Sequence, residues 1–532
     1  MSTSIMTTLA NQSRISIQSS RRVSALRRRA TLLGAVMLSA AALPAPASAS
    51  PLFELLGSQL GHGGFNARAT GPSAASAYFN PALLPQAEQG LELGFLVLND
   101  AINIRLDPRD SSVDVPLENT MSVRDEFYPL PTIWLDDGCV PVPRDDPNWR
   151  GCLTDTPARP RQSAGSSGNA QGYAAVGYVT HLLDDRWSMG VYSIVRVGGL
   201  LRADSFLPDE RAQYFSNSLH PELYADRLNA MSLAFGTGLR ITDWLSAGLS
   251  FTLNLSNEAN ATTFIGSSNI INETLVLRTE VDSQIGMAPH FSLLVEPHDS
   301  LDLSLAVHTP QGLEIVADTA TEIALGNRQP VFRRNVHFWL PLTVSLGAMF
   351  ELYRADGHVL GVAGTGMYKR WSKYENRHGE RPLPGYEWSD TTAGALGVRY
   401  SHGDALGTYL DVTYEPSAVP LQTGRTNYVD NDRFGTVGGA TYTVAVKDWG
   451  LSFRFGAQAQ IHVLRERHQS KRAPRPGNPS LVVDEFPDDS PNPQTGEPEE
   501  AAAGLQTNNP GWPGFASDGA VVAATLSVGL LY

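Results

Sequence analysis

The side chains that could perform chemistry are scattered along this chain and form no recognisable catalytic motif. The sequence contains no Gly-x-Ser-x-Gly elbow, no His-Glu-x-x-His pair and no glycine-rich phosphate loop followed by Lys-Ser or Lys-Thr. The single histidines at His62, His290, His298, His308 and His462 are expected to be polar wall residues or surface residues, not catalytic bases. The pattern predicts no enzyme, no metal site and no cofactor, with a lipid hydrolase as the formal alternative.

The two cysteines, Cys139 and Cys152, lie in one loop rich in Pro and Asp. A metal site would need His or Cys partners at ligand spacing, and none are near them in the sequence. In an exported protein, two cysteines in one loop predict a disulfide that staples the loop.

The stretch best suited to hold a ligand is 50–86, which is rich in Gly, Ala and Ser. It has too many Gly and Pro residues for a good strand and too many breaks for a long helix. Its small residues allow a close backbone approach, and its apolar side chains supply a binding surface: Phe53, Leu55, Leu56, Phe65, Tyr78, Phe79, Leu83 and Leu84. We expect a hatch over 50–90 whose binding or gating residues are Phe53, Leu56, Phe65, Tyr78, Phe79, Asn80, Pro81 and Ala82.

The first 49 residues have the organisation of an export signal. Arginines at 21, 22 and 27–29 precede an apolar run over 31–43, and Ala47-Ser48-Ala49 forms a cleavage site of the small-x-small type. The apolar run is shorter than the roughly 20 residues that a spanning helix needs. The sequence predicts a signal peptide over 1–49, with translation starting at Met1 or at the internal Met6.

Composition narrows the class of protein further. The 532 residues are 18% charged and 42% hydrophobic, with a formal net charge of −14. This balance excludes a disordered chain and argues against a nucleic-acid-binding protein, which would carry a basic face.

From residue 91 onward the sequence alternates apolar and polar or small residues over segments longer than ten residues. Period two indicates strands with one apolar face, and this length suits tilted membrane strands better than the strands of a soluble sandwich. Fourteen strands are predicted at 91–105, 170–182, 187–200, 228–240, 244–264, 276–296, 300–322, 337–353, 358–374, 389–401, 405–415, 434–446, 449–464 and 519–532.

The connections between these strands alternate between long loops and tight turns. Outer-membrane barrels show this asymmetry, with an even strand count. The last strand alternates up to a terminal aromatic residue, Tyr532, which resembles the signal read by the barrel-assembly machinery. The fold prediction is an all-β, 14-stranded antiparallel transmembrane β-barrel over 91–532, with an N-terminal hatch plugging its lumen.

Two loops of the predicted barrel are enlarged, 106–169 and 465–518. The second contains the acidic cluster Asp484, Glu485, Asp488 and Asp489. This cluster is interpreted as a solvated surface, or alternatively as a site for divalent cations or a face toward lipopolysaccharide.

Four ordered motifs resemble the FadL/TodX (OMPP1) family of outer-membrane transporters. Tyr78-Phe79-Asn80-Pro81-Ala82 resembles the hatch motif of the family, and Leu340-Pro341-Leu342-Thr343-Val344-Ser345-Leu346-Gly347 resembles one of its strands. Arg370-Trp371-Ser372-Lys373-Tyr374 is similar to a strand end, and Pro416-Ser417-Ala418-Val419-Pro420 with Asp430-Asn431-Asp432-Arg433 is similar to a loop. The resemblance runs from about residue 55 to Tyr532.

This resemblance implies passive uptake of long-chain fatty acids or other hydrophobic molecules through a hatch-gated lumen with a lateral exit, and a location in the bacterial outer membrane. The alternative is a structural or adhesive barrel whose enlarged loops bind partners at the cell surface. Asn80, which precedes Pro81, is expected to shape a turn through its own side chain more than to touch ligand. Arg68 is expected to pair with a wall acid such as Glu351, and alternatively with a fatty-acid carboxylate.

Overall fold

The computed structural model describes residues 51–61, 63–107, 163–165, 170–183, 186–197, 206–208, 218–221, 231–255, 259–266, 274–283, 285–323, 327–376, 379–424, 426–471, 485–486 and 513–532. The predicted signal peptide over 1–49, the pair Cys139 and Cys152, and most of the loops 106–169 and 465–518 lie outside these residues. Of the acidic cluster, only Glu485 is described.

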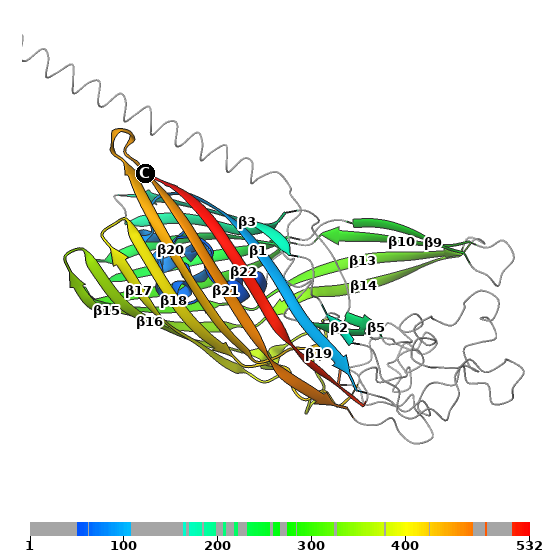
Figure 1. The fold of residues 1–532 in the computed structure, drawn as a ribbon. Helices are drawn as coiled ribbons and strands as arrows, with labels where there is room; N and C mark the ends of the chain where they lie inside the picture. Colours follow the sequence, from blue (N-terminus) through cyan, green and yellow to red (C-terminus); the bar gives the residue numbers. More distant parts are fainter. Residues whose placement is uncertain are drawn as a thin grey trace, which may run out of the picture. The chain divides into compact units, whose positions relative to one another are not determined.

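The alternating segments form one antiparallel sheet that closes on itself (Figure 1). Its strands are β1 (Gly90–Leu106), β3 (Gln171–Leu182), β4 (Trp187–Arg196), β7 (Met231–Thr242), β8 (Leu245–Leu255), β11 (Ile285–His298), β12 (Leu301–His308), β15 (Thr343–Ala355), β16 (His358–Lys369), β17 (Thr391–His402), β18 (Leu406–Glu415), β20 (Arg433–Val446), β21 (Leu451–Ser470) and β22 (Gly514–Leu531). Strand β1 pairs with β22 on one side and with β3 on the other, which closes the ring. The sheet has fifteen described strands, and without the short β2 (Ser163–Gly165) at the edge of β1 the ring has the predicted fourteen.

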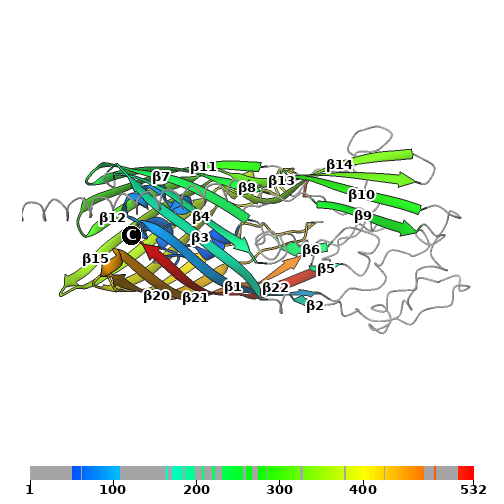
Figure 2. The ribbon, with the colours of Figure 1, turned by 90° about the horizontal axis from the view of Figure 1, so that it is seen from above.

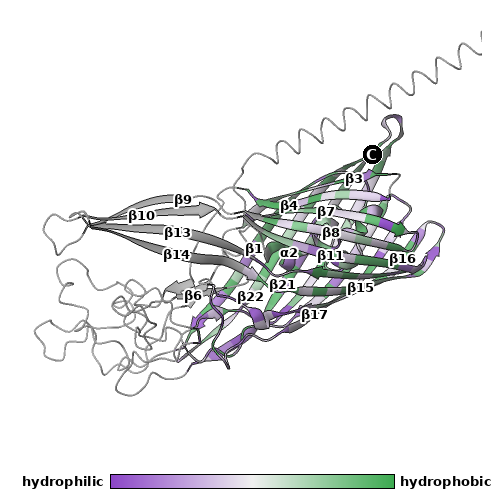
Figure 3. Ribbon diagram, turned by 180° about the vertical axis from the view of Figure 1, so that it is seen from behind, coloured by the Kyte–Doolittle hydropathy of each residue, from purple (hydrophilic) through white to green (hydrophobic). Residues whose placement is uncertain are grey.

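The barrel is apolar on its outside, the reverse of a soluble protein. Leu346, Leu396 and Leu526 are each more than 60% exposed, while the alternate positions along the same strands are covered. Apolar residues recur along the barrel strands in Figure 3. An outward apolar face is what a lipid environment requires of a closed barrel. Among the described residues, no helix combines the length and apolar character needed to cross a bilayer.

A second sheet of four strands extends beyond the ring, visible in Figure 2. This sheet has the order β14-β13-β10-β9, built from β9 (Ala259–Gly266), β10 (Thr274–Ser283), β13 (Gln311–Ile323) and β14 (Asn327–Leu340). Pro310 and Pro341-Leu342 interrupt the pairing between the two sheets, because proline has no N–H to donate to a ladder. The prediction of a loop over 323–336 was therefore wrong, since β14 occupies most of it.

A few short strands pair with one another outside the ring. Strands β5 (Phe206–Pro208), β6 (Ser218–Pro221) and β19 (Tyr428–Val429) form a small third sheet. The tight turns at Asp356-Gly357 and at Gly403 both join strands at the opposite end of the ring, in line with the predicted alternation of long loops and tight turns.

The segment before β1 folds as a plug inside the ring of strands (Figures 1 and 2). It consists of α2 (Pro51–Leu56), α3 (Ala67–Thr70), α4 (Ser76–Phe79) and the 3-10 helix η1 (Pro81–Gln86). Helix α4 contacts β4, β7 and β8, η1 contacts β4, β7, β8 and β11, and α3 contacts β12 and β15. The plug thus touches strands on a broad arc of the wall, as the hatch prediction required.

Candidate ligand site between plug and wall

The centre of the candidate site is Glu54, on the first helix of the plug. The Tyr78 hydroxyl donates a hydrogen bond of 2.8 Å to Glu54 Oε1. Arg68 Nη1 lies 3.5 Å from Glu54 Oε2, and Arg68 Nη2 donates to the Glu54 backbone carbonyl at 2.5 Å. The Glu54 side chain is only 13% exposed, so its charge depends on these partners.

The barrel wall supplies the other partners of Glu54. Lys369 Nζ lies 3.9 Å from Glu54 Oε2 and donates to Glu415 at 2.7 Å, and Arg433 Nη2 lies 2.5 Å from Glu415 Oε2. His308 Nδ1 lies 3.7 Å from Glu54 Oε1. The described ion pairs therefore join three permanent cations, counting Arg68, to two carboxylates.

These ion pairs set the protonation states of Glu54 and Tyr78 in the plug. Burial alone would raise the pKa of Glu54, but His308, Lys369 and Arg68 outweigh burial and hold the pKa of its carboxyl well below the usual range. Burial and the Glu54 carboxylate raise the pKa of Tyr78. Glu54 is therefore an anion and Tyr78 a neutral donor at physiological pH.

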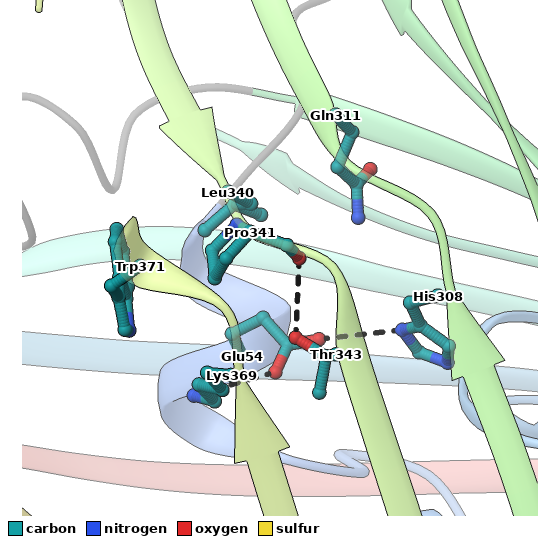
Figure 4. A pocket seen from close by; sticks show the side chains of 8 residues that line it. All are labelled: Glu54, His308, Gln311, Leu340, Pro341, Thr343, Lys369 and Trp371. Atoms are coloured by element: carbon teal, nitrogen blue, oxygen red, sulfur yellow. Dashed lines mark hydrogen bonds and ion pairs between the residues drawn. The ribbon is translucent and has the colours of Figure 1, made fainter. Parts of the chain in front are cut away.

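A small pocket opens beside Glu54 (Figure 4). Glu54 lies between His308 and Lys369 in this view, with Gln311 and Thr343 completing the polar lining. Leu340, Pro341 and Trp371 form the apolar lining. Lys369 ends β16, which starts at a tight turn, so the pocket lies on the side of the plug that faces the long loops.

An aromatic cluster adjoins this pocket through Trp371. Tyr374 stacks on Trp388, and Trp371 lies 5.6 Å from Trp388 between ring centroids. The cluster consists of Trp371, Tyr374, Trp388, Tyr428 and Phe486 with Ala418 and Val419, and Trp339 packs against it. It gives the loop side of the barrel a buried apolar region that continues into the pocket.

The structure brings four of the predicted site residues into one apolar cluster within the plug. Phe53 packs against Tyr78 at 4.8 Å and against Tyr192 of the wall at 5.0 Å between ring centroids. Leu56 and Phe79 belong to the same buried cluster. Of these residues only Tyr78 contacts Glu54 through a polar atom. This cluster fastens the plug to the wall.

The other predicted residues face different parts of the wall. Phe65 packs in a separate cluster with Ala395, Tyr409 and Val437. The Asn80 amide donates to the Ala69 carbonyl at 3.0 Å, so its side chain bonds backbone as expected.

The two residues after Asn80 lie against wall strands and do not line the pocket. Pro81 begins η1, and the Ala82 amide donates to Ser292 Oγ at 2.8 Å. A Cβ added at Gly248 of β8 would lie 2.2 Å from the Ala82 nitrogen, so the wall needs glycine there.

The expected pairing of Arg68 with Glu351 was wrong. Arg68 pairs within the plug with Glu54, while Glu351 pairs with Arg354 near the tight-turn end of the ring. Arg68 therefore pairs within the plug, and Lys369 of the wall faces the same Glu54 carboxylate.

Sequence reasoning missed Glu54, His308, Lys369, Glu415 and Arg433 as site residues. The available signal was strand parity: Lys369 falls in register with the inward positions Ala363, Thr365 and Met367 of its strand. A lysine at an inward position of a membrane strand marks a polar spot on the lumen wall. Within the described ranges, no three His, Cys, Asp or Glu residues gather in a way that could hold a metal ion.

No family model matches the chain, and no curated protein matches it. Several solved structures are similar. A FadL homologue from Pseudomonas aeruginosa is 14% identical, covers 92% of this chain and 99% of its own, and has a TM-score of 0.49. The toluene transporter TodX from P. putida is 14% identical with a TM-score of 0.46, covering 89% and 99%. The toluene transporter TbuX from Ralstonia pickettii is 12% identical with a TM-score of 0.39, covering 90% and 98%.

Proposed function

We propose that this protein is an outer-membrane channel for the passive uptake of hydrophobic molecules, with long-chain fatty acids as the favoured cargo. The plug closes the lumen, and its movement opens a path that ends in a lateral exit through the wall. The motifs resembling the FadL/TodX family and the barrel with an outward apolar face support this proposal.

The observation that carries the proposal is the divided lining of the pocket beside Glu54. Leu340, Pro341 and Trp371 form the apolar end of this pocket, which has room for about one water molecule while the plug is closed, and the aromatic cluster continues the apolar surface toward the loops. Lys369 offers a buried cation for a carboxylate head. An amphiphilic molecule with an anionic head fits this division better than a hydrophilic solute does.

The plug is the element whose movement would gate the path. It fills the ring with buried apolar residues and is also bonded to the wall through polar groups, among them those of Ala82, Asn66 and Gln59. Passive movement down a concentration gradient needs no nucleotide, and the sequence offers no phosphate-binding loop.

We extend the proposal to export, to assembly of the barrel and to the enlarged loops. Residues 1–49 direct export, the final strand is read by the barrel-assembly machinery, and the enlarged loops face lipopolysaccharide. A disulfide between Cys139 and Cys152 staples the first of these loops. We also propose that 50–90 and 91–532 act as hatch and barrel.

Locking the plug to the wall tests the proposal. A Cβ added at Gly190 of β4 would lie 3.3 Å from the Cβ of Ala77 in the plug, close to the roughly 3.5–4.5 Å of a disulfide. The double variant Ala77→Cys with Gly190→Cys is expected to lose uptake of labelled oleate when oxidised and to regain it on reduction, in cells that lack their own fatty-acid transporter.

The matched control joins two wall strands instead. A Cβ added at Gly94 of β1 would also lie 3.3 Å from the Cβ of Ala175, its paired residue on β3. Gly94→Cys with Ala175→Cys should transport equally well in both redox states. If the plug–wall variant transports when oxidised, with surface assembly confirmed by heat-modifiable migration, the adhesive or structural alternative gains support and hatch gating is wrong.

A further inference from the structure

Glu54 occupies the place that the carboxylate of a ligand would take. Its carboxylate lies at the polar end of the pocket, within 3.9 Å of Lys369 and 3.5 Å of Arg68, and it accepts from the Tyr78 hydroxyl. The side chains of Lys369 and His308, which face it from the wall, are 4% and 6% exposed. Such a set of donors is what a buried carboxylate needs to stay ionised.

The pocket also holds polar atoms that its own residues leave without a hydrogen bond. Among the described residues, Gln311 Oε1 is buried and has no hydrogen-bond partner, and His308 Nδ1 has only the 3.7 Å contact with Glu54 Oε1. Both side chains line the pocket next to Glu54. Buried polar atoms without partners are rare in native structures and point here to a group that the resting site lacks.

From these two observations we infer that Glu54 is a built-in competitor that holds the anion site until the carboxylate of an amphiphile replaces it on Lys369. The inference rests on the proposed function and adds the condition under which the plug opens. The plug carries the competitor, so a ligand that takes over Lys369 removes a link between plug and wall.

The mechanism distinguishes two kinds of hydrophobic cargo. A molecule with a carboxylate head can take the place of Glu54 beside Lys369, whose other carboxylate partner, Glu415, stays at 2.7 Å. An uncharged molecule of the same length can fill the apolar lining but leaves the Glu54–Lys369 contact in place. Opening of the plug should therefore favour the anionic amphiphile, because only differential interaction with two states shifts their balance.

Binding of oleate and of methyl oleate to the purified full-length protein in lipid nanodiscs tests the inference. The variant Glu54→Gln removes the competing charge and keeps the size of the side chain. It is expected to bind oleate at least about fivefold more tightly than the wild type, the lower range of typical coupling between sites. Its affinity for methyl oleate should be unchanged.

Two further variants keep the test decisive. Lys369→Met should abolish the preference for oleate over methyl oleate, and Glu351→Gln, whose pair with Arg354 lies elsewhere in the wall, should leave both affinities unchanged. Unchanged or weaker oleate binding by Glu54→Gln overturns the inference, as does a preference that survives in Lys369→Met. If the wild type binds neither molecule, the proposed function itself fails, which is a separate result.

Discussion

At the scale of single residues, Glu54 links the plug to three elements of the wall. It faces His308 on β12 and Lys369 on β16, and Lys369 in turn binds Glu415 on β18. Each link is made by a buried side chain, so removing one partner would leave an uncompensated charge. Residues that are remote in the sequence thus share two carboxylates, Glu54 and Glu415, for their electrostatic balance.

Because Glu54 carries a charge, the contact between plug and wall is sensitive to acid. Because the pKa of Glu54 is lower in the folded protein than its ordinary value of 4.5, ionisation stabilises the seated plug fully above that value. The stabilisation is lost as the pH falls below 4.5 through the lowered pKa. Hydrogen exchange of 51–86 should accelerate below about pH 4 and stay constant between pH 6 and 8.

Glu54→Gln is the matched variant for this prediction, and its plug should show no acid-dependent step attributable to this group. A step between pH 6 and 8 in the wild type would contradict the assignment. It would indicate that protonation of a group other than Glu54 controls the plug.

At the scale of elements, the wall strands follow directly from the sequence because lipid demands an apolar outer face. The alternation over 449–464 predicted β21, and the structure has it as Leu451–Ser470. In contrast, β14 contains Arg328, Arg333 and Arg334, which resemble loop residues. It is a strand because it pairs with β13 beyond the ring. A local sequence pattern does not reveal such a pairing between strands.

The site was less predictable than the strands. Glu54 and Lys369 are far apart in the sequence, and only the closure of the barrel around the plug brings them together. Neither residue belongs to a motif with fixed spacing. The hatch motif at Asn80-Pro81-Ala82 was visible in the sequence, but in the structure it shapes the plug at a distance from the pocket.

A wall glycine provides the prediction at this scale. The plug backbone passes so close to Gly248 that a Cβ there would lie 2.2 Å from the Ala82 nitrogen and 2.3 Å from the Pro81 carbonyl carbon. Gly248→Ala should therefore displace η1, at a cost of about 1–3 kcal/mol typical of overpacking. The expected result is faster hydrogen exchange of 81–86 and greater sensitivity of cells to large hydrophilic antibiotics.

Gly366→Ala is the control, because a Cβ at Gly366 on β16 meets no atom within 4 Å. This variant should match the wild type in both measurements. If Gly248→Ala also matches the wild type, the close approach between plug and wall does not hold the plug in place.

At the scale of the whole molecule, the plug and not the wall should be what seals the barrel. A ring of eight strands can be filled by its own inward side chains, whereas wider rings enclose a channel. Here several inward positions next to the plug are small, such as Ala234 on β7 and Ala288 on β11. Small inward residues leave room that only the plug occupies.

Deletion of 51–86, with β1 and all later strands intact, is accordingly expected to convert a closed barrel into an open pore. In planar lipid bilayers the deletion variant should show stable ion conductance, while the intact chain should conduct only in brief events or not at all. Heat-modifiable migration checks that the shortened barrel assembles, and the wall–wall cysteine variant serves as a closed reference. If the assembled deletion variant stays closed, wall side chains or loops seal the lumen, and plug movement would then be insufficient to open a path for any cargo.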